Sequence, residues 1–272
     1  MRRSRDARQS PRPRRARYGG RFVNNAAELT LESLRAHYGA AGPYYREALI
    51  AACRKAPPPF GTKKYEKIYR DVAKDPNWMA MSLIQNAQGE GEGSGHLWDL
   101  AACTPDVRVA AHIKAHAIDE SRHAKAYLAM LDLTFPDVVD NELRAQLDTL
   151  SPGYNQRSPL EPHEGSAYAS AATLDDLIQM NIAEIRTLVH HLIQRPMLLA
   201  YCAPERRHRL ALLHDRLRLD EARHIGYTAT LIEEFARRGE ADAVKRLMQE
   251  RMSDFNAITN EDLGRGAFKP DL

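Results

Sequence analysis

The chain has 272 residues but little cysteine, and its cysteines form no close pair. Cys53, Cys103 and Cys202 lie far apart and make no C-x-x-C motif. This scarcity argues against a disulfide framework, an iron–sulfur cluster and a structural zinc site, because each of these needs grouped thiols. A reducing cytosol fits such a composition best, so a cytoplasmic protein is expected.

Long apolar runs are missing too. No stretch approaches the roughly twenty consecutive apolar residues that a membrane-spanning helix needs, so no membrane span is expected. Strand-like alternation of apolar and polar residues is almost absent. Since 43% of the residues are hydrophobic, the chain can still bury a full core. The sequence therefore predicts an all-α protein.

Positive charge is concentrated at the start of the chain. Residues 1–21 carry nine arginines and one aspartate, a balance of +8, which leaves −5 for the rest because the total is +3. Apolar residues are few here, so residues 1–25 are expected to form a disordered basic tail. No apolar core follows the first arginines, which argues against an export signal. A solvated tail is favoured over a nucleic-acid-binding arm.

Residues 26–272 read as a succession of helices and are expected to form a single domain. Thr104 is expected to cap one helix, and Pro196 is expected to kink or end another. Turn residues and helix-start signals place the helices at 28–38, 43–56, 63–74, 77–101, 105–134, 138–149, 173–195, 204–238 and 240–253.

Four of these helices are long, and the third is expected to continue to about residue 200. Short links join the first to the second and the third to the fourth, so each pair should be antiparallel. Residues 135–167 form a much longer connection between the pairs. A bundle with one long crossover has the ferritin-like topology. We therefore expect a ferritin-like four-helix bundle over about 77–238, with extra N-terminal helices and a C-terminal helix.

One short motif occurs twice, about a hundred residues apart. Residues 119–123 read D-E-S-R-H and residues 220–224 read D-E-A-R-H. Each copy places a Glu and a His three residues apart, on one face of a helix. The two pairs are Glu120 with His123 and Glu221 with His224. Di-iron and di-manganese helix bundles use Glu-x-x-His on two helices and one Glu on each of two others.

The apolar phase of the helices tests whether these pairs point inward. Glu120 and His123 share a stripe with apolar residues from Ile113 to Met130, and Glu221 and His224 share another from Leu210 to Phe235. Placing four ionisable side chains on core-facing stripes costs several kcal/mol unless something satisfies them. Two metal ions would do so.

A two-metal site also needs a carboxylate from each of the other two long helices. Glu184 is in phase with Leu177 and Leu188, and no other acid lies in the middle of its helix. Glu90 is in phase with apolar residues of its helix and is favoured over Glu92, which falls on another face. Residues 89–95 contain four glycines, so a loop with a solvated Glu90 is the alternative. In a helix, the missing side chains would open space beside the metals.

The order Glu90, Glu120-x-x-His123, Glu184, Glu221-x-x-His224 resembles the ferritin-like non-haem di-iron carboxylate oxygenases and oxidases. The fuller D-E-x-R-H form, and the Leu-Trp-Asp that follows Glu90 at 97–99, are similar to the multicomponent monooxygenase hydroxylases. The arylamine N-oxygenases of this family have a further His ligand four residues before the last Glu. Leu217 occupies that position here, so this third-histidine site is not expected.

The resemblance also implies roles for residues around the ligands. Metal-bound histidines usually donate their second ring N–H to a carboxylate. Asp119 would then support His224 and Asp220 would support His123, with Arg122 and Arg223 closing the networks as ion pairs. Ordinary surface charges are the alternative. The side chains expected to line a pocket near the site are Glu92, Tyr127, Thr187, His191 and Tyr227.

The function that the resemblance implies is an O₂-dependent di-iron oxygenase or oxidase with a small organic substrate. Hydroxylation, N-oxygenation, desaturation and C–C cleavage stay open, as does a place in a biosynthetic pathway. The expected cofactors are two Fe ions, with Mn/Fe left open, and O₂ is the co-substrate. An external electron donor is expected, and a homodimer is left open. The alternatives are a ferroxidase or iron-handling protein and a non-catalytic subunit of a larger oxygenase.

Overall fold

The computed structural model describes residues 26–154 and 161–264, and the regular structure in these ranges is entirely helical. The all-α prediction is thus confirmed for this part of the chain, whereas the expected basic tail lies outside it. The helices are α1 (Ala26–His37), α2 (Pro43–Lys55), α3 (Lys63–Val72), α4 (Pro76–Cys103), α5 (Val107–Thr134), α6 (Asn141–Leu147), α7 (Leu174–Tyr201), α8 (Arg207–Phe235) and α9 (Ala241–Gly264).

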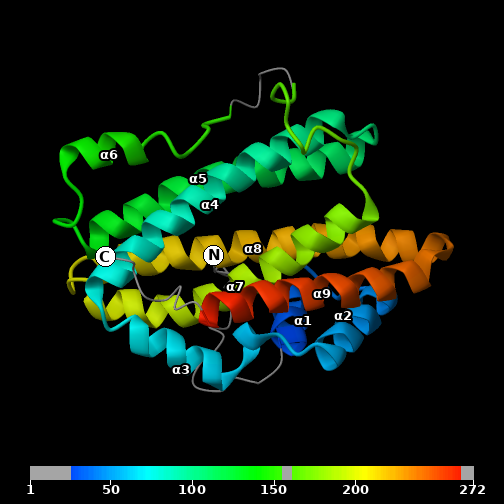
Figure 1. Cartoon of the computed structure of the whole chain (residues 1–272), viewed down its shortest axis with the longest axis horizontal. Helices are drawn as coiled ribbons and strands as arrows, with labels where there is room; N and C mark the ends of the chain where they lie inside the picture. Colours follow the sequence, from blue (N-terminus) through cyan, green and yellow to red (C-terminus); the bar gives the residue numbers. More distant parts are fainter. Residues whose placement is uncertain (1–25, 155–160, 265–272) are drawn as a thin grey trace, which may run out of the picture.

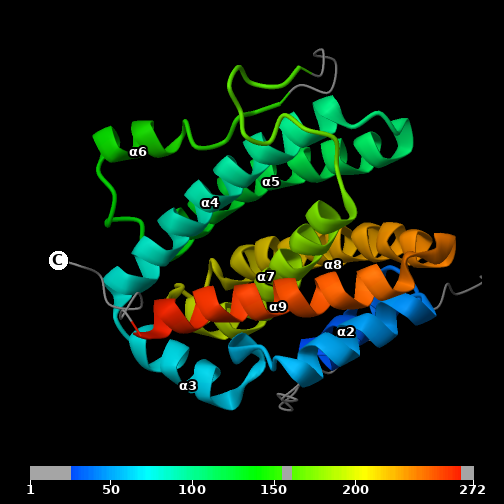
Figure 2. The ribbon, with the colours of Figure 1, turned by 45° about the vertical axis from the view of Figure 1, so that its right-hand side comes forward.

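The four longest bundle helices form two pairs, α4 with α5 and α7 with α8 (Figure 1). The crossover between the pairs carries the short helix α6 and runs over the outer side of α4 and α5 (Figures 1 and 2). Helices α1, α2, α3 and α9 cover the opposite side, next to α7 and α8. The pairs therefore face each other at the centre of the molecule, with α5 packed against α8.

Side-chain caps mark the starts of α4 and α5. Asp75 accepts a hydrogen bond from the backbone of Asn77 at the start of α4, and Asp106 accepts two at the start of α5. The prediction that Thr104 caps the next helix is wrong, because its hydroxyl instead donates to the carbonyl of Leu100 at the end of α4. Such caps satisfy N–H groups that lack a partner inside the helix.

Helix α7 continues through Pro196 to Tyr201, close to the expected end at about residue 200, and Leu198 in its last turn is buried. Gly239 does interrupt the chain after α8, with a φ of +104° that other residues rarely adopt. Helix α9 then runs to Gly264, well beyond the expected end at residue 253.

The glycine-rich segment 89–95 lies inside α4 and is helical throughout. Gly91 faces the crossover so closely that an added Cβ would lie 2.0 Å from the carbonyl oxygen of Leu150. At Gly89 and Gly93 an added Cβ would meet no atom within 4 Å. The glycines therefore have two different roles: one admits the crossover backbone, and two leave open space.

Alanine substitutions should separate these roles. Gly91→Ala is expected to destabilise the fold by about 1–3 kcal/mol, because the crossover must move away from α4. Gly89→Ala should instead stabilise it by up to about 1 kcal/mol, since alanine favours the helix and meets no neighbour. Urea unfolding of both variants measures the difference, and equal effects would contradict the packing seen at Leu150.

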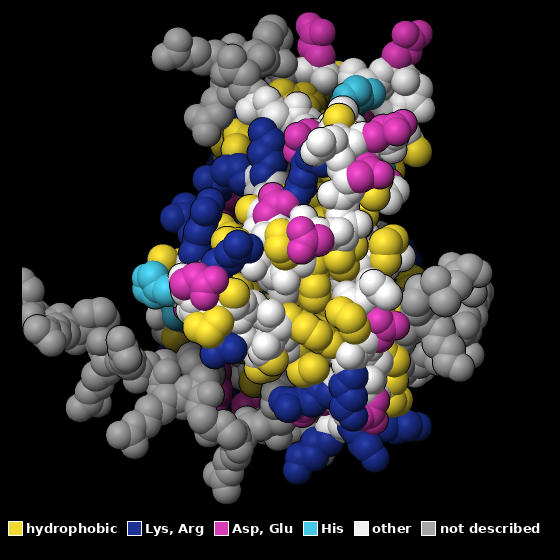
Figure 3. All heavy atoms as spheres, turned by 90° about the vertical axis from the view of Figure 1, so that its left-hand side faces the viewer, with side chains coloured by type: hydrophobic (Ala, Val, Ile, Leu, Met, Phe, Trp, Pro, Cys, Tyr) yellow, Lys and Arg dark blue, Asp and Glu magenta, His cyan; other side chains and the backbone are white. Residues whose placement is uncertain are grey.

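The described helices and the face of the molecule drawn in Figure 3 bear on membrane and nucleic-acid binding. Among the described helices, none combines the length and apolar character needed to cross a membrane. Figure 3 shows one end of the molecule, where lysine and arginine side chains form separate groups with acidic and hydrophobic side chains between them. This face lacks the continuous positive charge that suits a nucleic-acid backbone.

Candidate metal centre

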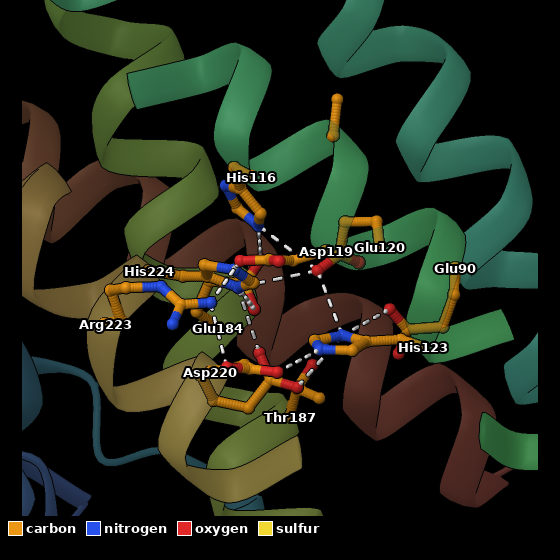
Figure 4. A network of polar contacts seen from close by, with 12 residues as sticks. Glu90, His116, Asp119, Glu120, His123, Glu184, Thr187, Asp220, Arg223 and His224 are labelled. Carbon is orange, nitrogen blue, oxygen red and sulfur yellow. Dashed lines mark hydrogen bonds and ion pairs between the residues drawn. The ribbon is translucent and has the colours of Figure 1, made fainter. Parts of the chain in front are cut away.

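Four helices bring histidine and glutamate side chains together in the core, where they point toward one another (Figure 4). Helix α4 supplies Glu90, and α7 supplies Glu184. Helices α5 and α8 supply the two Glu–His pairs. The side chains form two groups, in each of which the ligand atoms lie within 4.8 Å of one another. These groups are His116, Glu120, Glu184 and His224, and Glu90, His123 and Glu221.

Two carboxylates lie between the groups. Glu120 Oε1 is 3.3 Å from His116 Nε2 in its own group and 3.3 Å from His123 Nδ1 in the other. Glu221 Oε1 is 3.6 Å from His123 Nδ1, and its Oε2 is 3.3 Å from His224 Nδ1. The glutamate of each Glu–His pair thus lies near histidines of both groups, as a ligand shared by two metal ions would.

The buried atoms in this cluster lack the partners that buried polar atoms normally have. Five buried nitrogen and oxygen atoms of the two groups make no hydrogen bond to another described residue. They are His116 Nε2, Glu120 Oε1, His123 Nδ1, Glu221 Oε2 and His224 Nδ1. Since all five belong to the two groups, metal ions would satisfy them together. The donor set therefore fits two metal ions.

The opposite nitrogen of each imidazole is held by a neighbour. His224 Nε2 lies 3.2 Å from Asp119 Oδ2, and His123 Nε2 lies 3.4 Å from Asp220 Oδ2. His116 Nδ1 lies 2.9 Å from the hydroxyl of Tyr227. The crossed Asp–His contacts are those that the resemblance implied. They fix each ring so that its free nitrogen faces the cluster.

The two arginines of the repeated motif reach these aspartates from the surface. Arg223 forms ion pairs with both Asp119 and Asp220, and Arg122 pairs with Asp119. Their side chains are 47% and 53% exposed, whereas both aspartates are buried. The arginines thus balance the aspartate charges and link α5 to α8.

The pKa values of the carboxylates in the centre are shifted in opposite directions. Burial above all raises the pKa of Glu90 and of Glu221 well above the usual range. Burial acts in the same direction on Glu120, but contacts with Glu90, His116 and His123 leave its pKa well below the usual range. Burial, followed by repulsion from His116, lowers the pKa of His224 to about 4. Four ionised carboxylates at this position need compensating positive charge, which two divalent ions would supply.

His116 is a member of the cluster that the sequence analysis missed. It lies 3.2 Å from Glu184 Oε1, and its side chain is 1% exposed. Helix α5 therefore carries His-x-x-x-Glu-x-x-His, and His116 shares the core-facing stripe with Glu120. His116 lies four residues before Glu120. The sequence prediction considered a third histidine only at the matching position of the last bundle helix, which is Leu217.

Replacing His116 should affect one group of ligands and spare the other. His116→Ala is expected to lower the metal content from about two ions per chain to about one, because the group of Glu90, His123 and Glu221 stays complete. The control is His112→Ala, one turn away, whose exposed ring stacks on Tyr227 but lies outside both groups. Metal analysis after gel filtration measures both, and an unchanged content in His116→Ala would exclude it as a ligand.

A cavity of about 420 Å³ opens beside the centre, between α4 and α7. Of the expected pocket residues, Tyr127 and Thr187 line it. Glu92 does not, because its side chain is exposed on another face of α4. His191 lies 3.3 Å from Glu221 Oε1 and Tyr227 contacts His116, so these two lie behind ligands rather than along the cavity.

Comparison of the chain with protein-family models, with curated proteins and with solved structures gives no match.

Proposed function

We propose that this chain is a ferritin-like di-iron carboxylate protein that uses O₂ to oxidise a small organic molecule. The observation that carries the proposal is the double group of glutamates and histidines from four helices, with its unpartnered ligand atoms directed inward. Mixed carboxylate and imidazole donors suit iron and manganese. The repeated D-E-x-R-H motif and its resemblance to di-iron oxygenases and oxidases support the same class.

The chain's own residues would hold and neutralise the metals. With metal bound, Glu90, Glu120, Glu184 and Glu221 would supply four negative charges, which match the charge of two divalent ions. The histidines are oriented by Asp119, Asp220 and Tyr227. Two iron ions bound here would supply the electrons that reduce O₂, which no protein side chain in the centre can do. An external donor would restore those electrons.

The cavity favours an organic substrate over iron storage. Its volume of about 420 Å³ is that of a small-molecule site, and it is lined by Glu90, Glu120 and Glu184 from the centre. A subunit without catalytic function is disfavoured because both ligand groups are complete.

A single-turnover experiment tests the proposal. Protein loaded anaerobically with two Fe(II) per chain is mixed with O₂, and oxygen uptake and the visible spectrum are followed. We expect uptake of about one O₂ per two iron ions in wild type and none above background in Glu120→Ala. Absence of any reaction would refute the oxidase or oxygenase function. Continued uptake of iron far beyond two ions per chain would favour iron handling instead.

A further inference from the structure

Part of the α4 wall of the cavity beside the centre is formed by glycines. Gly89 and Gly93, one turn apart on α4, both line it, and an added Cβ at either would meet no atom within 4 Å. At one end the ring of His96 stacks on Tyr168 from the crossover, with centroids 3.8 Å apart. The cavity is therefore a slot between a glycine surface on α4 and the side chains of α7.

Among the described residues that line this slot there is no lysine and no arginine, and its charged histidine, His116, belongs to the metal centre. Burial lowers the pKa of His190 to about 3, so its ring is neutral. Asp176 is the one acid outside the metal centre, and its Oδ2 accepts hydrogen bonds from the backbone and the hydroxyl of Thr173. A bound anion would find no lysine or arginine along these walls.

Uncharged side chains supply hydrogen-bonding groups along the slot. Carboxamides come from both walls, Gln85 and Asn86 on α4 and Gln179 and Gln194 on α7. Those of Gln85 and Asn86 make no hydrogen bond within the described chain and can both donate and accept. On the α7 side, the hydroxyl of Thr187 donates to the carbonyl of Ala183, and its oxygen still accepts.

We propose that the slot between α4 and α7 binds an uncharged, hydrogen-bonding organic molecule, recognised by carboxamides and admitted by the glycine wall. This substrate class rests on the proposed function, since the metal centre forms the inner end of the slot. Once metal ions balance the four glutamates, a cation gains little attraction there. A carboxylate finds no lysine or arginine on these walls, and His116 already faces Glu120 and Glu184 of the centre.

Three probes of one shape and different charge test this specificity: benzamide, benzoate and benzylammonium. Binding to the full chain is measured by ligand-observed NMR, with and without Zn²⁺, and the metal content of each sample is determined first. We expect benzamide to bind at least ten times more tightly than benzoate in both samples. In the metal-loaded sample it should also bind more tightly than benzylammonium.

The three probes and the two samples distinguish a wrong substrate class from a wrong proposed function. Equal or tighter binding of benzoate, tighter binding of benzylammonium to metal-loaded protein, or no binding of benzamide would each overturn the substrate class. Protein that retains no metal but still prefers benzamide to benzoate would count against the metal centre and leave the slot's preference for uncharged ligands standing.

A pair of leucine substitutions locates the binding. Gly93→Leu fills the glycine wall and should weaken benzamide binding at least ten-fold. Gln88→Leu places the same side chain on the exposed face of α4 and should leave binding unchanged. Circular dichroism and metal content check that both variants are folded. Unchanged benzamide binding in a folded Gly93→Leu variant would contradict binding in the slot.

Discussion

Glu221→Ala is expected to reduce the metal content from about two ions per chain to near zero. Glu221 is the most buried carboxylate of the centre, and its two oxygens face His123 and His224 in different ligand groups. Its removal would therefore take a donor from both ligand groups. It also leaves two imidazole nitrogens directed at an empty space, and loss of a ligand from a buried site typically abolishes binding.

Glu92→Ala is the matched control for this experiment. Glu92 lies on α4 near Glu90, but its side chain is exposed and accepts a hydrogen bond from Gln88. Its metal content should equal that of wild type. Protein is produced in iron-supplemented medium and analysed by elemental analysis after gel filtration. Two retained ions in Glu221→Ala, or a content near zero in wild type, would disprove the two-metal centre.

Much of the centre could be predicted because helical periodicity is local. The spacing of three residues within each Glu–His pair, and its phase against apolar neighbours, requires no knowledge of how helices pack. Glu184 and Glu90 followed from the same phase, and the structure brings Glu90 rather than Glu92 to the cluster. The crossed contacts of Asp119 and Asp220 depend on α5 facing α8, and they were expected from the family resemblance rather than from helical periodicity.

Other features depend on tertiary packing and could not be predicted from the sequence. Gly91 is explained only by the approach of Leu150 from the crossover, 59 residues further along the chain. The cavity exists because α4 and α7 pair with other helices rather than with each other. His116 was missed for a different reason: Leu217 breaks the repeat at the matching position, so a search guided by the duplicated motif passed over it.

Removing the metals should lower the stability of the protein. Without ions, the centre holds four glutamates and three histidines, and five of their buried atoms, from Glu120, Glu221, His116, His123 and His224, lack hydrogen bonds. A ligand that binds only the folded state stabilises it by about 4 kcal/mol at a thousand times its Kd. For a chain of this size that corresponds to a rise in Tm of roughly 5–10 °C. Differential scanning calorimetry of metal-free and metal-loaded protein measures the difference.

The same stabilisation should shrink as the pH falls. Burial raises the pKa of Glu90 and Glu221 in the metal-free protein, so these carboxyls bind protons that a metal must displace. Lower pH favours the protonated carboxyls and weakens metal binding, and the gain in Tm from metal should decrease steadily below neutral pH. In Glu221→Ala the Tm should not respond to metal at any pH. A gain in Tm that is constant from neutral to acid pH would show that these two carboxylates do not bind the ions.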